Sequence, residues 1–283
     1  MNDQLQDNIV RGCDKSLSAY NVTYKQSYHS KSLGAYSETI IKHIIPAALF
    51  FRHITSSRYT ISNKQDFYKN FSQEILQTIH SYQNLTSQGM PYTDIYLTQQ
   101  NFLHNLFNQS LLINQATSQH TIHSTILRPI RILDICFGLG YNAMLGLETF
   151  QCCEIYSPEK DYLLPELLKF DYTNIANAHK ILNELQKNRV YNHKKQTLYF
   201  LHGNALHILE SFPQGFFDIV FQDAFSQAQN PELWSKQYFQ KLDYITAKNC
   251  IITTYAKAKN ILESAQHANF STIKYEHGSI FYK

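Results

Sequence analysis

The chain has 283 residues, of which 43% are apolar and 17% charged, and its formal net charge is +3 with the histidines neutral. This composition excludes a disordered chain, and nine glycines with seven prolines exclude a collagen-like or low-complexity protein. No stretch reaches the ~18 consecutive apolar residues of a membrane helix, and the mild positive charge permits an RNA partner without requiring one.

The cysteines and the N-terminus indicate the compartment. The five cysteines are odd in number and contain no C-x-x-C pair, so neither a zinc site nor a disulfide framework is expected. The N-terminus has no apolar segment behind a basic start, so no signal peptide is expected. We therefore predict a cytoplasmic protein without a bound metal and without a membrane partner.

The first part of the chain predicts one strand and three helices. Alternating residues predict a strand over 16–24, and helical periodicity covers 37–51, with Ser37 as its N-cap, then 67–82 and 99–114. We interpret residues 1–127 as an N-terminal extension with a helical insertion at 52–127. It is expected to pack on the substrate side of a catalytic domain at 128–283.

The second part alternates between strands and helices. The helices are expected over 141–150, 163–185, 204–211, from 231 and over 256–267, and the final residues predict two strands around Gly278. The five strands before that pair are predicted at 130–135, 152–156, 197–201, 216–221 and 250–254. Such alternation indicates an α/β fold with a Rossmann-like, doubly wound parallel sheet, whose ligands bind beyond the carboxyl ends of the strands.

The residues that follow the first strand form a glycine-rich turn. Asp134 lies inside the apolar strand, and Gly138 and Gly140 follow it, with Ala143 or Asn142 where a dinucleotide fingerprint has its third glycine. The glycines allow the backbone to turn tightly and to approach a ligand. Asp134 is either a satisfied partner of nearby backbone amides or an anchor near a cationic ligand.

Polar residues also follow the next three strands. Glu159 could accept the hydroxyl protons of a ribose, Asn204 with Ala205 could read an adenine edge, and Asp223 closes an apolar strand where a substrate amine could bind. An acid or a glycine after four successive strands predicts S-adenosyl-L-methionine as the cofactor. The candidate cofactor-binding residues are Asp134, Phe137, Gly138, Gly140, Asn142, Glu159, Lys160, Asn204, Ala205 and Asp223.

Three segments resemble one methyltransferase family. FDIVFQDAFSQAQNPELWSKQYF, at 217–239, is similar to its D-x-x-F-x-D-x-F-x-P-x-x-N-P-x-x-W signature, ILDICFGLGYN to its first motif, and SYHSKSLGAYSET, at 27–39, to its substrate-side entry. The family is the methyltransferase half of the bifunctional tRNA 5-methylaminomethyl-2-thiouridine biosynthesis protein (MnmC) with its stand-alone relatives. The likeness covers about 15–50 and 128–283. Gln227 stands where the family usually has proline, and Asp134 where it usually has Glu.

The resemblance implies an S-adenosyl-L-methionine-dependent tRNA methyltransferase. Its reaction would convert the aminomethyl group of the wobble uridine, in the tRNA anticodon loop, to methylaminomethyl, without the flavin oxidase domain of the bifunctional proteins. For this reaction we predict that Asp223 binds or deprotonates the amine, that Phe225 is the second catalytic residue, and that Trp234 adds an apolar wall. The further substrate-side candidates are Tyr28, His29, Ser30 and Glu38.

Two alternatives remain open at this point. An aminopropyltransferase of the spermidine synthase type would use the same sheet, although its cationic substrate favours an acidic entry and the N-terminal region is basic. A non-catalytic RNA-binding protein could keep the sheet without turnover, although the glycines, Glu159 and Asp223 are all intact. Basic residues at 187–195 and in the N-terminal part are candidates for RNA contact or a solvated face.

Overall fold

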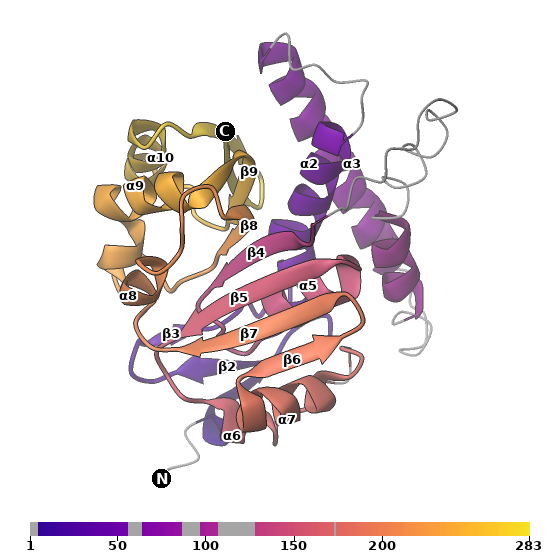
Figure 1. Cartoon of the computed structure of the whole chain (residues 1–283). Helices are drawn as coiled ribbons and strands as arrows, with labels where there is room; N and C mark the ends of the chain where they lie inside the picture. The colour runs from indigo at the N-terminus through magenta and orange to yellow at the C-terminus, as the bar shows by residue number, and fades with distance from the viewer. Residues whose placement is uncertain (1–4, 56–63, 87–96, 107–127, 173) are drawn as a thin grey trace.

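The computed structural model describes residues 5–55, 64–86, 97–106, 128–172 and 174–283. Its centre is an eight-stranded sheet in the order β10-β11-β9-β8-β4-β5-β7-β6 (Figure 1). The strands are β4 (Ile130–Ile135), β5 (Cys153–Glu159), β6 (Val190–His193), β7 (Gln196–His202), β8 (Phe217–Gln222), β9 (Thr246–Thr254), β10 (Ser271–Tyr275) and β11 (Gly278–Tyr282). The predicted Rossmann-like α/β fold is confirmed.

The middle of the sheet is parallel and its edges are antiparallel. Parallel pairs join β7 to β5, β5 to β4, β4 to β8 and β8 to β9, whereas β11, β10 and β6 run against their neighbours. The chain thus builds outward from β4 in both directions. The crevice at this switch in strand order is where doubly wound sheets bind ligands.

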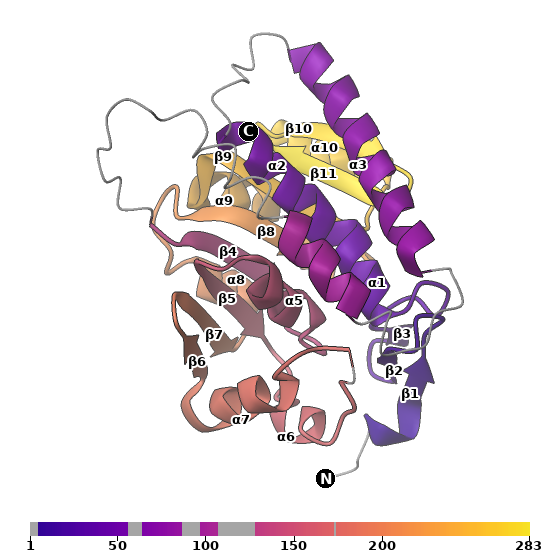
Figure 2. The same ribbon diagram turned by 90° about the vertical axis from the view of Figure 1, so that its right-hand side faces the viewer.

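Two sets of helices cover the two faces of the sheet (Figures 1 and 2). Successive side chains of a strand point to opposite faces, so Ile132 packs with one set and Leu133 with the other. The first face carries α1 (Ala35–Thr39), η2 (Ile40–Ile44), α2 (Ile45–Thr55), α3 (Lys64–Thr86), α5 (Tyr141–Thr149), α6 (Leu164–Leu167) and α7 (Ala178–Asn188). The second carries α8 (Ala205–Leu209), η3 (Pro231–Trp234), α9 (Lys236–Ile245) and α10 (Lys259–His267).

The N-terminal residues form a small separate sheet before the first helix. Its strands are β1 (Ile9–Arg11), β2 (Leu17–Asn21) and β3 (Gln26–Ser27), which follow η1 (Gln6–Asn8). The helices after it share one apolar cluster with the central sheet, in which Ile44 and Phe50 pack with Ile219 and Ile251. The division at residues 127 and 128 stays a prediction, and 107–127 lie outside the described residues.

Several predicted boundaries are wrong. Ser37 is not an N-cap, because the helix begins at Ala35 after Gly34 and continues through η2, a π-helical turn, into α2. The predicted helix at 163–185 is two helices, α6 and α7, and β6 was not expected. The helix predicted at 99–114 is described over 97–106. No helix in the described ranges is long and apolar enough to cross a membrane.

Candidate functional site

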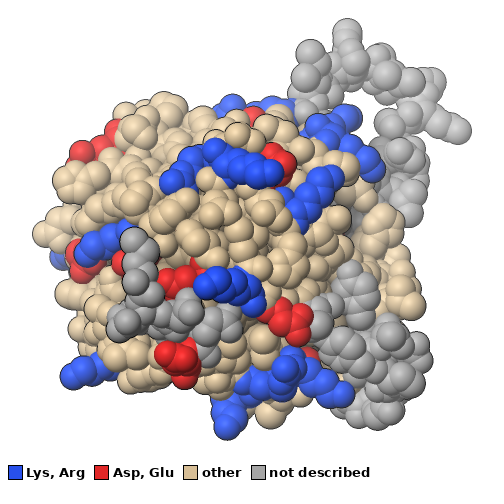
Figure 3. Space-filling model, turned by 90° about the horizontal axis from the view of Figure 1, so that it is seen from below, with Lys and Arg blue, Asp and Glu red and all other residues tan. Residues whose placement is uncertain are grey.

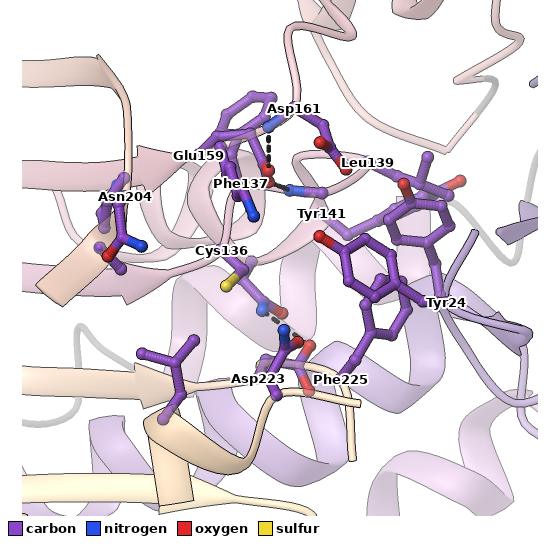
Figure 4. Close-up of a pocket in the computed structure, with 18 of the residues that line it drawn as sticks. Tyr24, Cys136, Phe137, Leu139, Tyr141, Glu159, Asp161, Asn204, Asp223 and Phe225 are labelled. Atoms are coloured by element: carbon purple, nitrogen blue, oxygen red, sulfur yellow. Dashed lines mark hydrogen bonds between the residues drawn. The ribbon is translucent and has the colours of Figure 1, made fainter. Parts of the chain in front are cut away.

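A pocket of about 850 Å³, counting the space open to solvent, lies at the carboxyl ends of β4, β5, β7 and β8 (Figure 4). Asn204 lies on the opposite side of the pocket from Tyr24 and Phe225, with Cys136 between them. The predicted residues that line the pocket are Tyr28, His29, Phe137, Gly138, Asn142, Glu159, Lys160, Asn204, Ala205, Asp223 and Phe225.

The glycine-rich turn is held by a carboxylate. Glu159 accepts hydrogen bonds from the backbone N–H of Gly138 at 2.8 Å and of Asp161 at 2.9 Å. Burial raises the pKa of Glu159, and these backbone donors oppose the increase. Gly140 has φ +81°, and a Cβ there would lie 2.7 Å from the Phe137 ring. The turn therefore requires glycine at 140 and brings the backbone against the pocket.

Asp134 lies beneath this turn rather than in the pocket wall. It is fully buried, Ser157 Oγ donates to its Oδ2 at 2.7 Å, and its Oδ1 has no partner among the described residues. Burial raises its pKa to about 8. The carboxyl group is thus neutral at pH 7 in the free protein, whereas an ionic anchor for a cationic ligand would carry a negative charge. Its predicted contact with the cofactor stays a prediction.

Asp223 is held at the pocket by groups from two helices. Asn142 Nδ2 donates to its Oδ2 at 3.0 Å, and Thr39 Oγ1 in turn donates to Asn142 Oδ1 at 3.0 Å. Burial would raise its pKa, but the nearby His43, when protonated, and the donated hydrogen bonds hold that pKa at about 2. Asp223 is therefore ionised and able to accept hydrogen bonds, and Asn142 holds its carboxylate in one orientation.

Aromatic rings form the wall beside Asp223. The Phe225 ring lies 4.9 Å from that of Tyr24 and 5.1 Å from that of Tyr28, between ring centroids (Figure 4). Gln26 Oε1 accepts a hydrogen bond from the Ser226 backbone N–H at 3.1 Å, so the β2–β3 hairpin is docked on the loop after β8. The hairpin and the sheet thus complete the pocket together.

Besides Asp134, four predicted site residues lie outside the pocket lining. Trp234 is buried and donates its Nε1–H to the Phe225 carbonyl at 2.7 Å, so it holds the loop from behind. Glu38 accepts from the Ser30 backbone N–H and pairs with Lys42. None of Trp234, Glu38 and Ser30 lines the described pocket, nor does Gly140. The roles proposed for them remain predictions.

The loop after β8, where Gln227 stands in place of the expected proline, is held by hydrogen bonds from side chains. Gln227 Oε1 accepts a hydrogen bond from Asn260 Nδ2 at 2.7 Å, and Tyr255 Oη donates to the Ala224 carbonyl at 2.9 Å. A side-chain hydrogen bond thus restrains the position where proline would restrict the backbone.

Sequence reasoning missed part of the lining. Leu139, Tyr141, Pro158, Asn230 and Leu233 also reach the pocket, as does Cys136, whose φ of +69° is unusual for a residue with a side chain. Burial raises the pKa of the Cys136 thiol well above its ordinary value. Most of these side chains carry no charge or amide that would mark them in the sequence, and the amide of Asn230 lies in the loop before η3 rather than directly after a strand. The described residues contain no group of three or more His, Cys, Asp or Glu placed to hold a metal ion.

Comparisons with known proteins show similarity to methyltransferases. A family model described as S-adenosyl-L-methionine-dependent methyltransferase matches residues 169–279. The tRNA 5-methylaminomethyl-2-thiouridine biosynthesis bifunctional protein MnmC from Pseudomonas syringae pv. tomato is 24% identical over 215 residues, covering 68% of this chain and 32% of that protein. MnmC from Pseudomonas savastanoi pv. phaseolicola is 26% identical over 152 residues, covering 47% and 23%. The chain thus spans about a quarter to a third of these relatives.

A solved structure shares the fold over nearly the whole chain. MNMC2 from Aquifex aeolicus has a TM-score of 0.61 at 20% identity, and the likeness covers 97% of this chain and 70% of that one. The chain therefore shares the Rossmann-like α/β fold of that structure. The residues present fit S-adenosyl-L-methionine, whose sulfur carries a positive charge, because the carboxyl groups of Glu159, Asp161, Asp223 and Glu232 line the pocket.

Proposed function

We propose that this MnmC-like, S-adenosyl-L-methionine-dependent methyltransferase methylates the aminomethyl group of the wobble uridine in the tRNA anticodon loop. The observation that carries the proposal is Asp223, an ionised acid that faces the pocket beside the Phe225, Tyr24 and Tyr28 rings. An acid beside aromatic surfaces suits an amine attached to a nucleobase. Action on tRNA places the protein in the cytoplasm, which remains part of the proposal.

The cofactor is proposed to lie between the glycine turn and Asn204. Glu159 would accept hydrogen bonds from ribose hydroxyls, and the backbone at Gly138 would approach the methionine part. Asn204 Oδ1 already accepts from the Leu206 N–H as the cap of α8, which leaves its amide nitrogen and the neighbouring backbone for the adenine edge. When bound, S-adenosyl-L-methionine supplies an electrophilic methyl group on a positively charged sulfur.

The protein's contribution to methyl transfer is mainly positioning. Asp223 would accept a hydrogen bond from the acceptor nitrogen and turn its lone pair toward the methyl group, because Asn142 fixes the direction of the carboxylate. Phe225 would exclude water from the reacting atoms and face the developing charge. Tyr24 and Tyr28 are proposed to stack on the uridine base.

Charge does not by itself define where the rest of the tRNA lies. Lys and Arg side chains occur in several groups over the face seen in Figure 3, with Asp and Glu between them, rather than in one stripe. The Arg189 guanidinium also lies 4.2 Å from the centre of the Tyr162 ring, so it is engaged with its own surface. The proposal therefore rests on the pocket and not on a basic path.

Methyl transfer with an Asp223 variant tests the proposal. Purified protein is incubated with methyl-labelled S-adenosyl-L-methionine and tRNA that carries the unmethylated aminomethyl group. We expect label in tRNA, a loss of about 10²-fold or more in Asp223→Asn, and normal transfer in Asp171→Asn, whose side chain is exposed. Cofactor affinity should match the wild type in Asp171→Asn and stay measurable in Asp223→Asn, although Asp223 lines the pocket. Absence of label with the wild-type protein, despite cofactor binding, would contradict the tRNA reaction.

A further inference from the structure

His43 lies directly behind Asp223 in the π-helical turn η2. Its side chain is 1% exposed, whereas the side chain of Asp223 is 18% exposed and lines the pocket. His43 Nδ1 lies 2.7 Å from Thr253 Oγ1 on β9, and its Nε2 lies 3.5 Å from Asp223 Oδ1. The ring also packs 5.6 Å from the ring of Phe221, between centroids. A titratable ring thus lies on the side of Asp223 away from the pocket.

The two ring nitrogens of His43 have different environments. Nδ1 is paired with a hydroxyl, but Nε2 has no hydrogen-bond partner among the described residues although it faces a carboxylate. A buried polar atom without a partner in a native fold calls for an explanation, and catalytic proton handling is one. If Nδ1–H donates to Thr253 Oγ1, a lone pair on Nε2 faces Asp223, and no hydrogen bond forms until a proton arrives.

The proposed reaction requires such a proton acceptor. A primary amine is largely protonated near pH 7, and only its neutral form can attack. Asp223 lines the pocket and His43 Nε2 lies 3.5 Å behind its Oδ1, so a proton that the carboxylate takes from an ammonium group can pass on to the ring. An imidazole ordinarily titrates near about 6.5 and can hold a proton at neutral pH.

We propose that His43 is a positioning residue for methyl transfer, which keeps the proton that Asp223 removes from the acceptor ammonium. The inference rests on the proposed function, because it requires an amine acceptor. An N–H bond of the ammonium breaks as a carboxyl O–H forms; that O–H then breaks as Nε2–H forms, which restores the carboxylate. The nitrogen lone pair next forms the C–N bond as the C–S bond breaks, with its electron pair left on sulfur. The proton returns to solvent through Asp223 after the product leaves.

Other charged and titratable groups surround this pair and enter any pH dependence. They come from the loop after β3, from β4, from the residues after β9, and from α1 and η2 themselves; they are His29, Asp134, Tyr255, Glu38 and Lys42. Burial lowers the pKa of His29, so this ring is neutral at pH 7. The test must therefore observe His43 itself.

Nitrogen NMR of ¹⁵N-histidine-labelled protein observes His43 without any tRNA. Comparison with His43→Gln assigns its signals. At pH 8 we expect the neutral ring to be protonated on Nδ1, and in Asp223→Asn we expect the Nε2 signal of His43 to shift, because an amide replaces the carboxylate that faces Nε2. A ring protonated on Nε2 at pH 8, or an unchanged Nε2 signal in Asp223→Asn, would overturn the proposal.

Single-turnover rates across pH test the role in turnover. At pH 7 we expect His43→Gln to lose about 10²-fold and to approach the wild-type rate as pH rises and the free amine accumulates. Cofactor affinity should stay within about twofold, and His267→Gln, with an exposed side chain, should match the wild type. Equal wild-type and His43→Gln profiles, or an equal loss at every pH, would overturn the assignment.

The two measurements separate the two proposals. If the wild-type protein transfers no methyl group to an amine, the proposed function fails, and the NMR experiment still decides whether His43 and Asp223 share a proton site. If transfer occurs but the His43→Gln profile is unchanged, only the role of His43 fails. Should His43→Gln fold poorly, His43→Asn, whose side-chain amide can also donate toward Thr253, assigns the signals, and the Asp223→Asn spectrum then provides the answer.

Discussion

The buried carboxyl of Asp134 couples the stability of the free protein to pH. Its pKa of about 8 in the folded protein lies above the ordinary value of about 3.9 in an unfolded chain. Between these values the folded state binds a proton that the unfolded state lacks. The free energy of unfolding contributed by Asp134 is therefore fully present below about pH 4 and falls as pH rises toward 8.

Asp134→Asn should remove this dependence. Between pH 6 and 8 we expect the wild type to lose about 2 kcal/mol more unfolding free energy than the variant, because the amide cannot ionise. Urea unfolding of both proteins at the two pH values measures the difference, and histidine titration cancels between them. Parallel decreases in the two proteins would show that Asp134 is already ionised in the fold.

Glu159 combines a structural and a proposed binding role. It accepts two backbone hydrogen bonds that hold the glycine turn, and it reaches the pocket. Glu159→Gln should weaken S-adenosyl-L-methionine binding about 10- to 100-fold, because charge-assisted hydrogen bonds are lost. Since burial raises its pKa, wild-type binding should weaken as pH falls, beginning above the usual range of a glutamate.

Calorimetry measures the affinity of Glu159→Gln for S-adenosyl-L-methionine. Glu210→Gln is the control, because the carboxylate of Glu210 is exposed at the end of α8. The Glu210 variant should bind as the wild type does. Equal affinity in the Glu159 variant would remove the carboxylate from the cofactor site.

The β2–β3 hairpin contributes the site residues that lie farthest in the sequence from the strands of the central sheet. Tyr24 contacts Phe225, and Gln26 is paired with Ser226, so the hairpin positions a ring beside the acceptor side of the pocket. Tyr24→Ala should raise KM for tRNA about tenfold and leave cofactor affinity nearly unchanged, because base stacking contributes about 1–3 kcal/mol.

Tyr20→Ala provides the matched control for Tyr24→Ala. Tyr20 is 38% exposed on β2 of the same small sheet and does not line the described pocket. Steady-state kinetics with varied tRNA should separate the two variants. Similar KM values for both would argue against stacking by Tyr24.

Local patterns predicted the elements around the pocket but not every boundary. The apolar spacing of 163–185 fits one helix, yet Tyr172 Oη donates to the Leu139 carbonyl at 2.7 Å and Asn177 adopts a left-handed conformation, which separates α6 from α7. That contact is made across the fold. Asp134 was singled out as an acid inside an apolar strand, and Gly138, Glu159 and Asp223 as polar residues or glycines after apolar strands; both are local signals.

His43 and Asn142 show what the sequence could not reveal. Asn142 was noticed as a substitute for glycine, but its hydrogen bond to Asp223 spans 81 positions of the chain. His43 follows Lys42 in the helical segment 37–51 and no motif marks it in the sequence, and its partner Thr253 is 210 positions away. Such pairings depend on the crossing of η2 over β9, which no local periodicity encodes.

At the scale of the whole molecule, the pocket belongs to one continuous structure. The helices after the small sheet share an apolar cluster with the central strands, and the hairpin closes the pocket from outside. A ligand that bridges these parts should stabilise the entire fold by mass action, by about 2.7 kcal/mol at 100 times its Kd. The N-terminal region is thus proposed to act in the site and not merely to cover it.

The most direct test of the central claim is the identity of the methylated product. Wild-type protein is given labelled S-adenosyl-L-methionine with, in parallel, tRNA that carries the aminomethyl uridine and a polyamine, and the products are separated as nucleosides or amines by mass spectrometry. We predict labelled methylaminomethyl uridine from tRNA and no labelled polyamine. Label in the polyamine, or in another tRNA nucleoside, would contradict the account.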